Sequence, residues 1–79
     1  MPVIELTKKL FDRFNNRIKP RDNDVINICD KDKTIHFCNK FKDMRLIEIS
    51  DYLGQDVIEE QKYFDPIEDN YIIFLVIDK

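Results

Sequence analysis

Residues 71–77 form an unbroken apolar run, Tyr-Ile-Ile-Phe-Leu-Val-Ile, near the end of a 79-residue chain. A run of this length is far shorter than the roughly 20 residues that a membrane-spanning helix requires. It also lacks the alternation of apolar and polar residues that marks a strand with one solvated face, and it is typical of a strand buried on both faces. We therefore expect a strand in the centre of a sheet.

A β-hairpin is predicted before the middle of the chain. Residues 24–29 and 34–39 are rich in β-branched and aromatic side chains, and they flank the polar tetrapeptide 30–33. Pairing Cys29 with Thr34 places the apolar side chains of both strands on one face, so this register is internally consistent.

In that register Ile28 lies opposite Ile35, and Cys29 lies four residues along the ladder from Cys38. Four residues at a rise of about 3.3 Å separate the two cysteines by about 13 Å. Disulfide formation requires Cα atoms within roughly 7 Å. We expect both cysteines to be reduced thiols.

An amphipathic helix is predicted over residues 3–18. Pro2 suits its first position, and Pro20 ends it because proline cannot continue the hydrogen-bond ladder. The apolar face repeats at helical spacing and comprises Val3, Ile4, Thr7, Leu10, Phe11, Phe14 and Ile18.

Two further elements are expected in the second half. Residues 44–50 favour a third strand, with Ile47 and Ile49 on one side. Asp56 is a suitable N-cap for a short second helix, which Pro66 closes.

The predicted fold is therefore a single α+β domain over residues 1–79, in the order α-β-β-(β)-α-β. Its N-terminal amphipathic helix packs on a mostly antiparallel sheet of three to four strands. A composition that is 43% apolar and 37% charged is typical of a folded globular chain.

Charge is divided unevenly along the chain. Residues 1–45 carry eleven Lys/Arg and seven Asp/Glu, a net of 11 − 7 = +4, whereas residues 46–79 carry two and nine, a net of 2 − 9 = −7. This asymmetry indicates either a charged binding surface or pairing between the two halves within the fold.

The residue types argue against enzymatic chemistry. Gly54 is the sole glycine, which excludes glycine-rich phosphate-binding loops. Cys29, His36 and Cys38 share one predicted hairpin face, but the cysteines are too far apart to bind one zinc ion. A Cys38–His36 thiol-imidazole pair lies far behind as an alternative. We expect no catalytic residues, no metal and no cofactor.

The leading hypothesis is a small non-enzymatic binding protein, an inhibitor or regulator, that uses an acidic surface to occupy another protein's site. Spaced carboxylates imitate a nucleic-acid backbone, so mimicry is one route to such binding. The predicted contact residues are Glu48, Asp51, Asp56, Glu59, Glu60, Asp65, Glu68 and Asp69.

The alternative hypothesis is a nucleic-acid-binding module. A basic stripe on the predicted first helix is suited to phosphates, and an aromatic residue flanked by lysines is typical of a platform for stacking bases. The residues concerned are Lys9, Arg13, Arg17, Lys40, Phe41 and Lys42.

Composition also suggests a context. Small size and a Lys/Asn/Ile/Asp-rich sequence resemble accessory proteins of phages or mobile elements, and no signal sequence or membrane span is evident. We expect a cytoplasmic protein, in the producing cell or an infected host. An uncovered face of the apolar last strand favours a homodimer.

Overall fold

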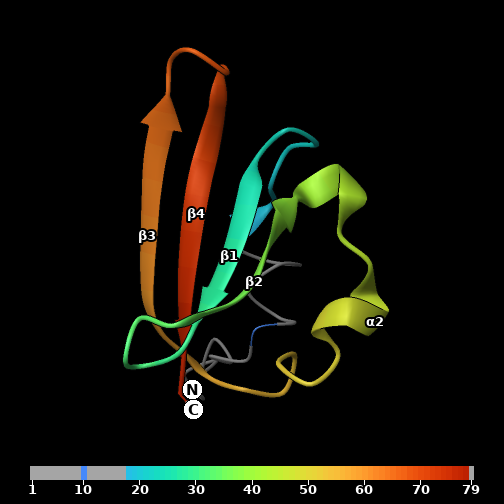
Figure 1. Cartoon of the computed structure of the whole chain (residues 1–79), viewed down its shortest axis with the longest axis vertical. Helices are drawn as coiled ribbons and strands as arrows, with labels where there is room; N and C mark the ends of the chain where they lie inside the picture. The colour runs from blue at the N-terminus through green and yellow to red at the C-terminus, as the bar shows by residue number, and fades with distance from the viewer. Residues whose placement is uncertain (1–9, 11–17, 79) are drawn as a thin grey trace, which may run out of the picture.

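The computed structural model describes residue 10 and residues 18–78. They form a four-stranded sheet in the order β2-β1-β4-β3 (Figure 1). β1 pairs with β2 and β3 pairs with β4 in antiparallel fashion, whereas β1 and β4 are parallel. The elements in chain order are β1 (Val25–Cys29), β2 (Ile35–Lys40), the 3-10 turn η2 (Phe41–Asp43), α2 (Leu46–Ile49), β3 (Val57–Asp65) and β4 (Asn70–Ile77).

The predicted fold class, an N-terminal amphipathic helix packed on a mostly antiparallel sheet, is wrong. The described residues form a mixed sheet with one short helix and one 3-10 turn. The predicted helix over 3–18 lies outside the described residues, apart from Leu10 and Ile18, whose side chains are buried in the core.

The predicted third strand over residues 44–50 is wrong, because four of these residues form α2, a single helical turn. The backbone N–H of Arg45 donates to the Glu48 carboxylate at 3.0 Å, and the Glu48 N–H donates to the Arg45 carbonyl at 2.9 Å. This reciprocal pair satisfies groups at the start of the turn. The turn buries Ile49 and leaves Ile47 75% exposed, whereas a strand would have placed both on one side.

The predicted second helix, capped by Asp56, is also wrong, since β3 occupies this segment. The strand pairs with β4 from Val57 to Asp65. It begins with two β-branched residues and has two aromatic residues before its last residue, Asp65, and both types favour strands. Pairing with the central strand outweighs the helix propensity of the Glu-Glu-Gln-Lys sequence between them.

β4 lies between β1 and β3, so the predicted central position of the apolar run is confirmed. Its side chains Ile73, Leu75 and Ile77 are buried in the core. On the other face Ile72 and Phe74 are half-buried. The run is therefore covered well on one side and less well on the other.

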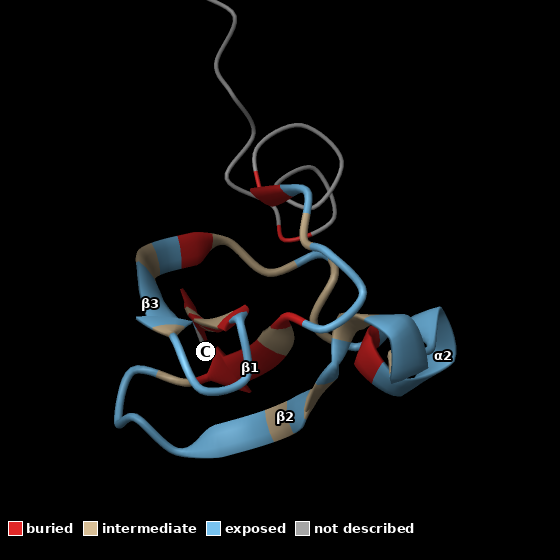
Figure 2. Cartoon of the chain, turned by 90° about the horizontal axis from the view of Figure 1, so that it is seen from above, coloured by how far each residue is buried: buried red, intermediate tan, exposed pale blue. Residues whose placement is uncertain are grey.

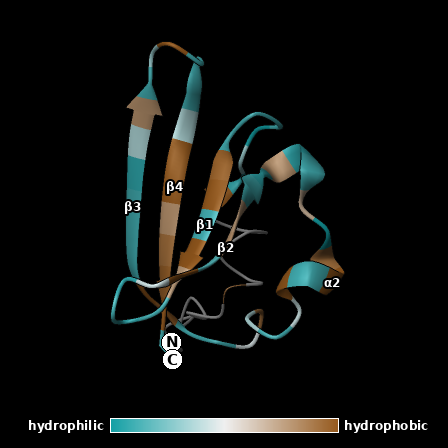
Figure 3. Cartoon of the chain, viewed as in Figure 1, coloured by the Kyte–Doolittle hydropathy of each residue, from teal (hydrophilic) through white to brown (hydrophobic). Residues whose placement is uncertain are grey.

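The core lies on one face of the sheet, and Figure 2 shows its buried segments gathered around β1 and β4. Figure 3 shows that β1 and β4 are mainly apolar, whereas β3 is mainly polar. We call the opposite face of the sheet, on which the half-buried Ile72 and Phe74 lie, the open face. The core residues are Leu10, Ile18, Ile26, Ile28, Ile49, Val57, Ile73, Leu75 and Ile77.

The β1–β2 hairpin is confirmed, but its predicted register is wrong by two residues. Ile28 lies opposite Phe37, and a bulge follows, so that Cys29 lies opposite Ile35. His36 is the extra residue of this bulge. The bulge moves Ile35 to the open face, away from the apolar face on which it was expected.

The turn of this hairpin explains the shift. Asp30 Oδ1 accepts hydrogen bonds from the N–H groups of Asp32 at 2.8 Å and Thr34 at 3.1 Å. Lys33 adopts a positive φ of 68°. These local bonds keep Thr34 in the turn, so β2 begins one residue later than expected.

Replacing Leu75 with alanine should lower the free energy of unfolding by about 3 kcal/mol, because it opens a cavity in the fully buried core. The matched control Ile47→Ala removes an exposed side chain and should change stability by less than about 0.5 kcal/mol. Urea denaturation measures both. Equal losses would contradict the assignment of the core face.

Candidate protein-binding surface

The acidic residues predicted to bind a partner do not form one face. The structure divides them into a group around α2, a group along β3, and a group at the β3–β4 turn. α2 and that turn lie at opposite ends of the described part of the molecule (Figure 1). The groups are Glu48, Asp51 and Asp56; Glu59 and Glu60; and Asp65, Glu68 and Asp69.

Two acidic residues of the group around α2 form hydrogen bonds within the fold. The Glu48 carboxylate accepts the Arg45 N–H described above. Asp51 is exposed in the turn that follows the helix. Asp56 precedes β3, and its backbone carbonyl accepts a hydrogen bond from the Asp78 N–H at 2.8 Å. These residues connect elements at the α2 end of the molecule.

Glu59 and Glu60 point to opposite faces because they are consecutive residues of a strand. Glu59 forms an ion pair with Lys33 and accepts a hydrogen bond from Gln61 Nε2 at 3.1 Å. The hydrogen bond from Lys33, and then its positive charge, lower the pKa of the Glu59 carboxyl. Glu59 therefore belongs to a contact between the two halves of the chain.

A second ion pair joins the two halves in the same way. Lys31 Nζ lies 2.5 Å from Asp78 Oδ1. The hydrogen bond to Asp78, and then its negative charge, raise the pKa of Lys31. Part of the charge asymmetry along the sequence is thus internal pairing across the fold.

The β3–β4 turn brings the third acidic group together. Asp65 Oδ1 accepts hydrogen bonds from the N–H groups of Ile67 at 3.0 Å and Glu68 at 3.4 Å. Asp69 closes the turn with a positive φ of 52°. Ile67 is 90% exposed between these carboxylates. We call residues 65–69 the acidic tip.

Aromatic contacts between β3 and β4 stabilise the hairpin next to the acidic tip. Phe64 packs edge-on against Tyr71, with ring centroids 5.2 Å apart, and Lys62 Nζ lies 4.4 Å from the centroid of the Tyr71 ring. On the open face Tyr63 packs edge-on against Phe74 at 6.0 Å. These cross-strand contacts stabilise the end of the hairpin that carries the tip.

Ile67, Tyr63 and Phe64 were not predicted as site residues. Tyr63 and Phe64 were expected in a helix, and Ile67 follows the proline that was expected to close it. The signal lay in the sequence Asp-Pro-Ile-Glu-Asp-Asn at 65–70, which combines Pro, Asp and Asn as turns do. An isoleucine in such a turn has no neighbouring strand face on which to pack.

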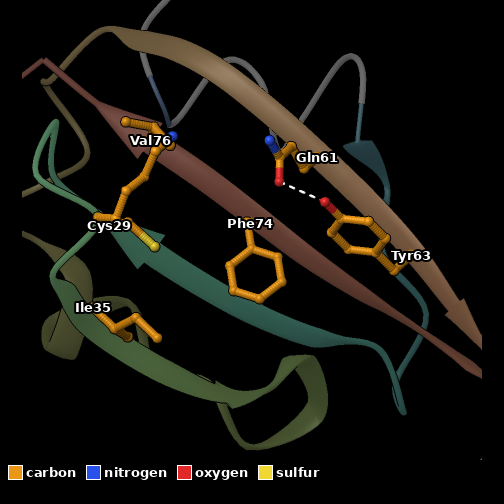
Figure 4. A pocket seen from close by; sticks show the side chains of 7 residues that line it. Cys29, Ile35, Gln61, Tyr63, Phe74 and Val76 are labelled. Carbon is orange, nitrogen blue, oxygen red and sulfur yellow. Dashed lines mark hydrogen bonds between the residues drawn. The ribbon is translucent and has the colours of Figure 1, made fainter.

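The open face carries a shallow hollow of about 290 Å³ (Figure 4). Tyr63 and Gln61 lie on one side of it, linked by a hydrogen bond from the Tyr63 hydroxyl to Gln61 Oε1 at 2.7 Å. Its lining residues are Cys29, Lys33, Ile35, Gln61, Tyr63, Phe74 and Val76.

Both cysteines are free, as expected. Burial raises the pKa of the Cys29 thiol, which favours its protonated, unreactive form. His36 departs from the shared face predicted for it, since its Nε2 lies 2.8 Å from Asp30 Oδ2 and its ring 5.9 Å from that of Tyr52. Within residue 10 and residues 18–78, no group of three or more His, Cys, Asp or Glu side chains is placed to hold a metal ion.

The basic residues of the alternative hypothesis are only partly described. Lys9, Arg13 and Arg17 lie outside the described residues. Lys40 ends β2, and the exposed Lys42 lies in η2. Phe41 packs against the core, and its N–H donates to the Asp24 carbonyl at 2.8 Å, so its ring is not a free stacking platform. The 18–78 segment with residue 10 contains no helix long and apolar enough to cross a membrane.

Replacing Lys33 with methionine should raise the pKa of Glu59, because the hydrogen bond and charge that lower it are removed. A depressed pKa in the folded state stabilises the fold above the ordinary glutamate pKa, and this contribution disappears as the pH falls through the folded pKa. Carboxyl NMR titration measures the midpoint. Lys42→Met is the matched control, and an unchanged Glu59 midpoint in Lys33→Met would contradict the pairing.

Comparison with known proteins finds no matching family model, no matching curated protein and no matching solved structure.

Proposed function

We propose that this protein is a small non-enzymatic binding protein, an inhibitor or regulator, that inserts its acidic tip into a positively charged site on another protein. The observation that carries the proposal is the 90% exposure of Ile67 within a turn held by Asp65. An apolar side chain in a turn that also carries three carboxylates matches an apolar pocket with a basic rim.

The geometry of the tip favours tight binding. The hydrogen bonds of Asp65 order the turn before any partner arrives, so less conformational entropy is lost on association. Ile67 is an exposed apolar side chain that a pocket on the partner can remove from water. Anchor residues buried in this way contribute most of the binding free energy at interfaces. Glu68 and Asp69, both exposed, supply the charge that speeds association with a basic surface.

The proposed contact is narrower than the acidic face expected from sequence. It keeps Asp65, Glu68 and Asp69 and leaves the group around α2 outside, because that group lies at the other end of the molecule. A partner whose cationic site normally binds a phosphate backbone suits these carboxylates. Such a role fits an accessory protein of a phage or mobile element that acts in the cytoplasm.

The test is capture of partners from host lysate on the immobilised protein, with affinity then measured on the purified partner. Ile67→Asp and Glu68→Lys should each weaken binding about tenfold or more, as loss of an interface anchor does. The matched controls Ile47→Asp and Asp51→Lys make the same changes at exposed positions near α2 and should weaken it less than about twofold.

A partner bound equally well by the tip variants and the wild type would contradict the proposal. Equal losses in tip and control variants would do so as well, since they would indicate a general charge effect. Retention on single-stranded DNA that falls steeply with salt, while a cation-exchange control at matched salt retains nothing, would favour the nucleic-acid alternative.

A further inference from the structure

The second edge of β3 is the longest strand edge in the described part of the molecule. β3 spans nine residues and pairs with β4 on one side, and it is the last strand of the sheet order β2-β1-β4-β3. Its single irregularity is a bulge near its start, between Val57 and Glu59, so the backbone from Glu59 to Asp65 is regular. Edge strands of this kind present unpaired N–H and C=O groups that pair readily with another strand.

The side chains of β3 are complementary to those of an antiparallel copy of the same strand. When Gln61 lies opposite the partner's Gln61, Glu60 lies opposite the partner's Lys62, and Lys62 lies opposite the partner's Glu60. A two-fold axis makes both attractive pairs at once. We propose that two copies of this protein dimerise by pairing β3 with β3 in this register, which joins two four-stranded sheets into one of eight strands.

Charge selects this register over its neighbours. A shift of one residue would place side chains of opposite faces against each other, which a continuous sheet does not allow. A shift that centres the axis on Glu60 places Glu60 opposite the partner's Glu60, and one that centres it on Lys62 places two lysines together. Like charges directly opposite are destabilising, so the Gln61 register is favoured over both.

The same register covers exposed apolar surface. Ile58 and Phe64 are about half exposed, at 53% and 52%. In this register Phe64 reaches the partner's bulge, whose extra residue is Ile58, so the two apolar side chains come near each other. The pairing thus combines two ion pairs at the axis with two apolar pairs flanking them.

The dimer also has a consequence for the open face. Glu59, Gln61 and Tyr63 form a hydrogen-bonded row on that face, and two of them line the hollow. In the dimer this row lies beside the partner's row, so the two hollows flank the axis. The two acidic tips lie at opposite ends of the paired strands and remain free. The dimer does not depend on the proposed function of the tip.

The test exchanges the charges that face each other across the axis. In Glu60→Lys the introduced charge faces the partner's Lys62, and in Lys62→Glu it faces the partner's Glu60. Each variant should be monomeric where the wild type dimerises, with a dimer dissociation constant raised about tenfold or more from the reversal of two opposed pairs. Sedimentation velocity across a dilution series measures this.

Mixing the two variants restores both attractive pairs, because one chain then carries two lysines and the other two glutamates at these positions. The mixture should form a heterodimer with an affinity close to that of the wild type, which also shows that both variants are folded. The controls Asp51→Lys and Lys42→Glu apply the same charge changes away from β3 and should leave dimerisation intact.

Three results would overturn the inference. They are a wild-type chain that stays monomeric at the highest concentration, a dimer that survives both single variants, and a mixture that stays monomeric. None of them bears on capture of a partner by the acidic tip, which the Ile67 and Glu68 variants measure separately.

Discussion

The parallel pairing of β1 with β4 is the constraint on which the rest of the described structure depends. It joins strands that are far apart in the chain, in register from Val25 opposite Ile72 to Cys29 opposite Val76. The buried Asp24 anchors this pairing, since its Oδ1 accepts the Tyr71 N–H at 2.9 Å and its Oδ2 accepts the Arg21 N–H at 2.9 Å. A buried carboxylate with two such partners fixes where the strands begin relative to each other.

A second bond reinforces this anchor. The Asn70 side-chain Nδ2 donates to the Asn23 carbonyl at 2.8 Å, just before β1. Because β1 occupies one edge of β4, only the other edge remains for β3. The hairpin of β3 and β4 then extends past Val25, the first residue of β1, and its turn lies away from α2 (Figure 1).

The charge asymmetry of the sequence has two different structural origins. Lys31 and Lys33, from the basic half, pair with Asp78 and Glu59 from the acidic half, so these charges are paired within the fold. Such exposed pairs contribute little stability each, about 0 to 1 kcal/mol. The carboxylates of the acidic tip flank an exposed apolar residue in one turn, and this combination is the reason for proposing the tip as a contact surface.

The parts of the fold that sequence analysis predicted correctly are those with strong local signals. The apolar run at 71–77 and the polar tetrapeptide 30–33 each specify an element through their own composition. The segment 57–65 does not, because its Glu-Glu-Gln-Lys centre favours a helix and only pairing with β4 makes it a strand.

The candidate site could be predicted only in part for the same reason, since local sequence does not specify that residues 57–65 are extended. The acidic residues were identifiable by type, but their division into three groups follows from β3 being extended. An extended β3 separates Glu59 from Glu60 by face and carries Asp65 far from Asp56. The exposure of Ile67 could not be predicted, because a helix closed by Pro66 was expected here and the β3–β4 turn at 65–70 was not.

The most direct measurement is a set of backbone NOEs from β4 in the intact protein. The fold predicts cross-strand NOEs from Phe74 to Gln61 on one side, in antiparallel register, and to Asn27 on the other, in parallel register. Helical i, i+3 NOEs across residues 57–65, with none from this segment to β4, would contradict the sheet and with it both proposed contact surfaces.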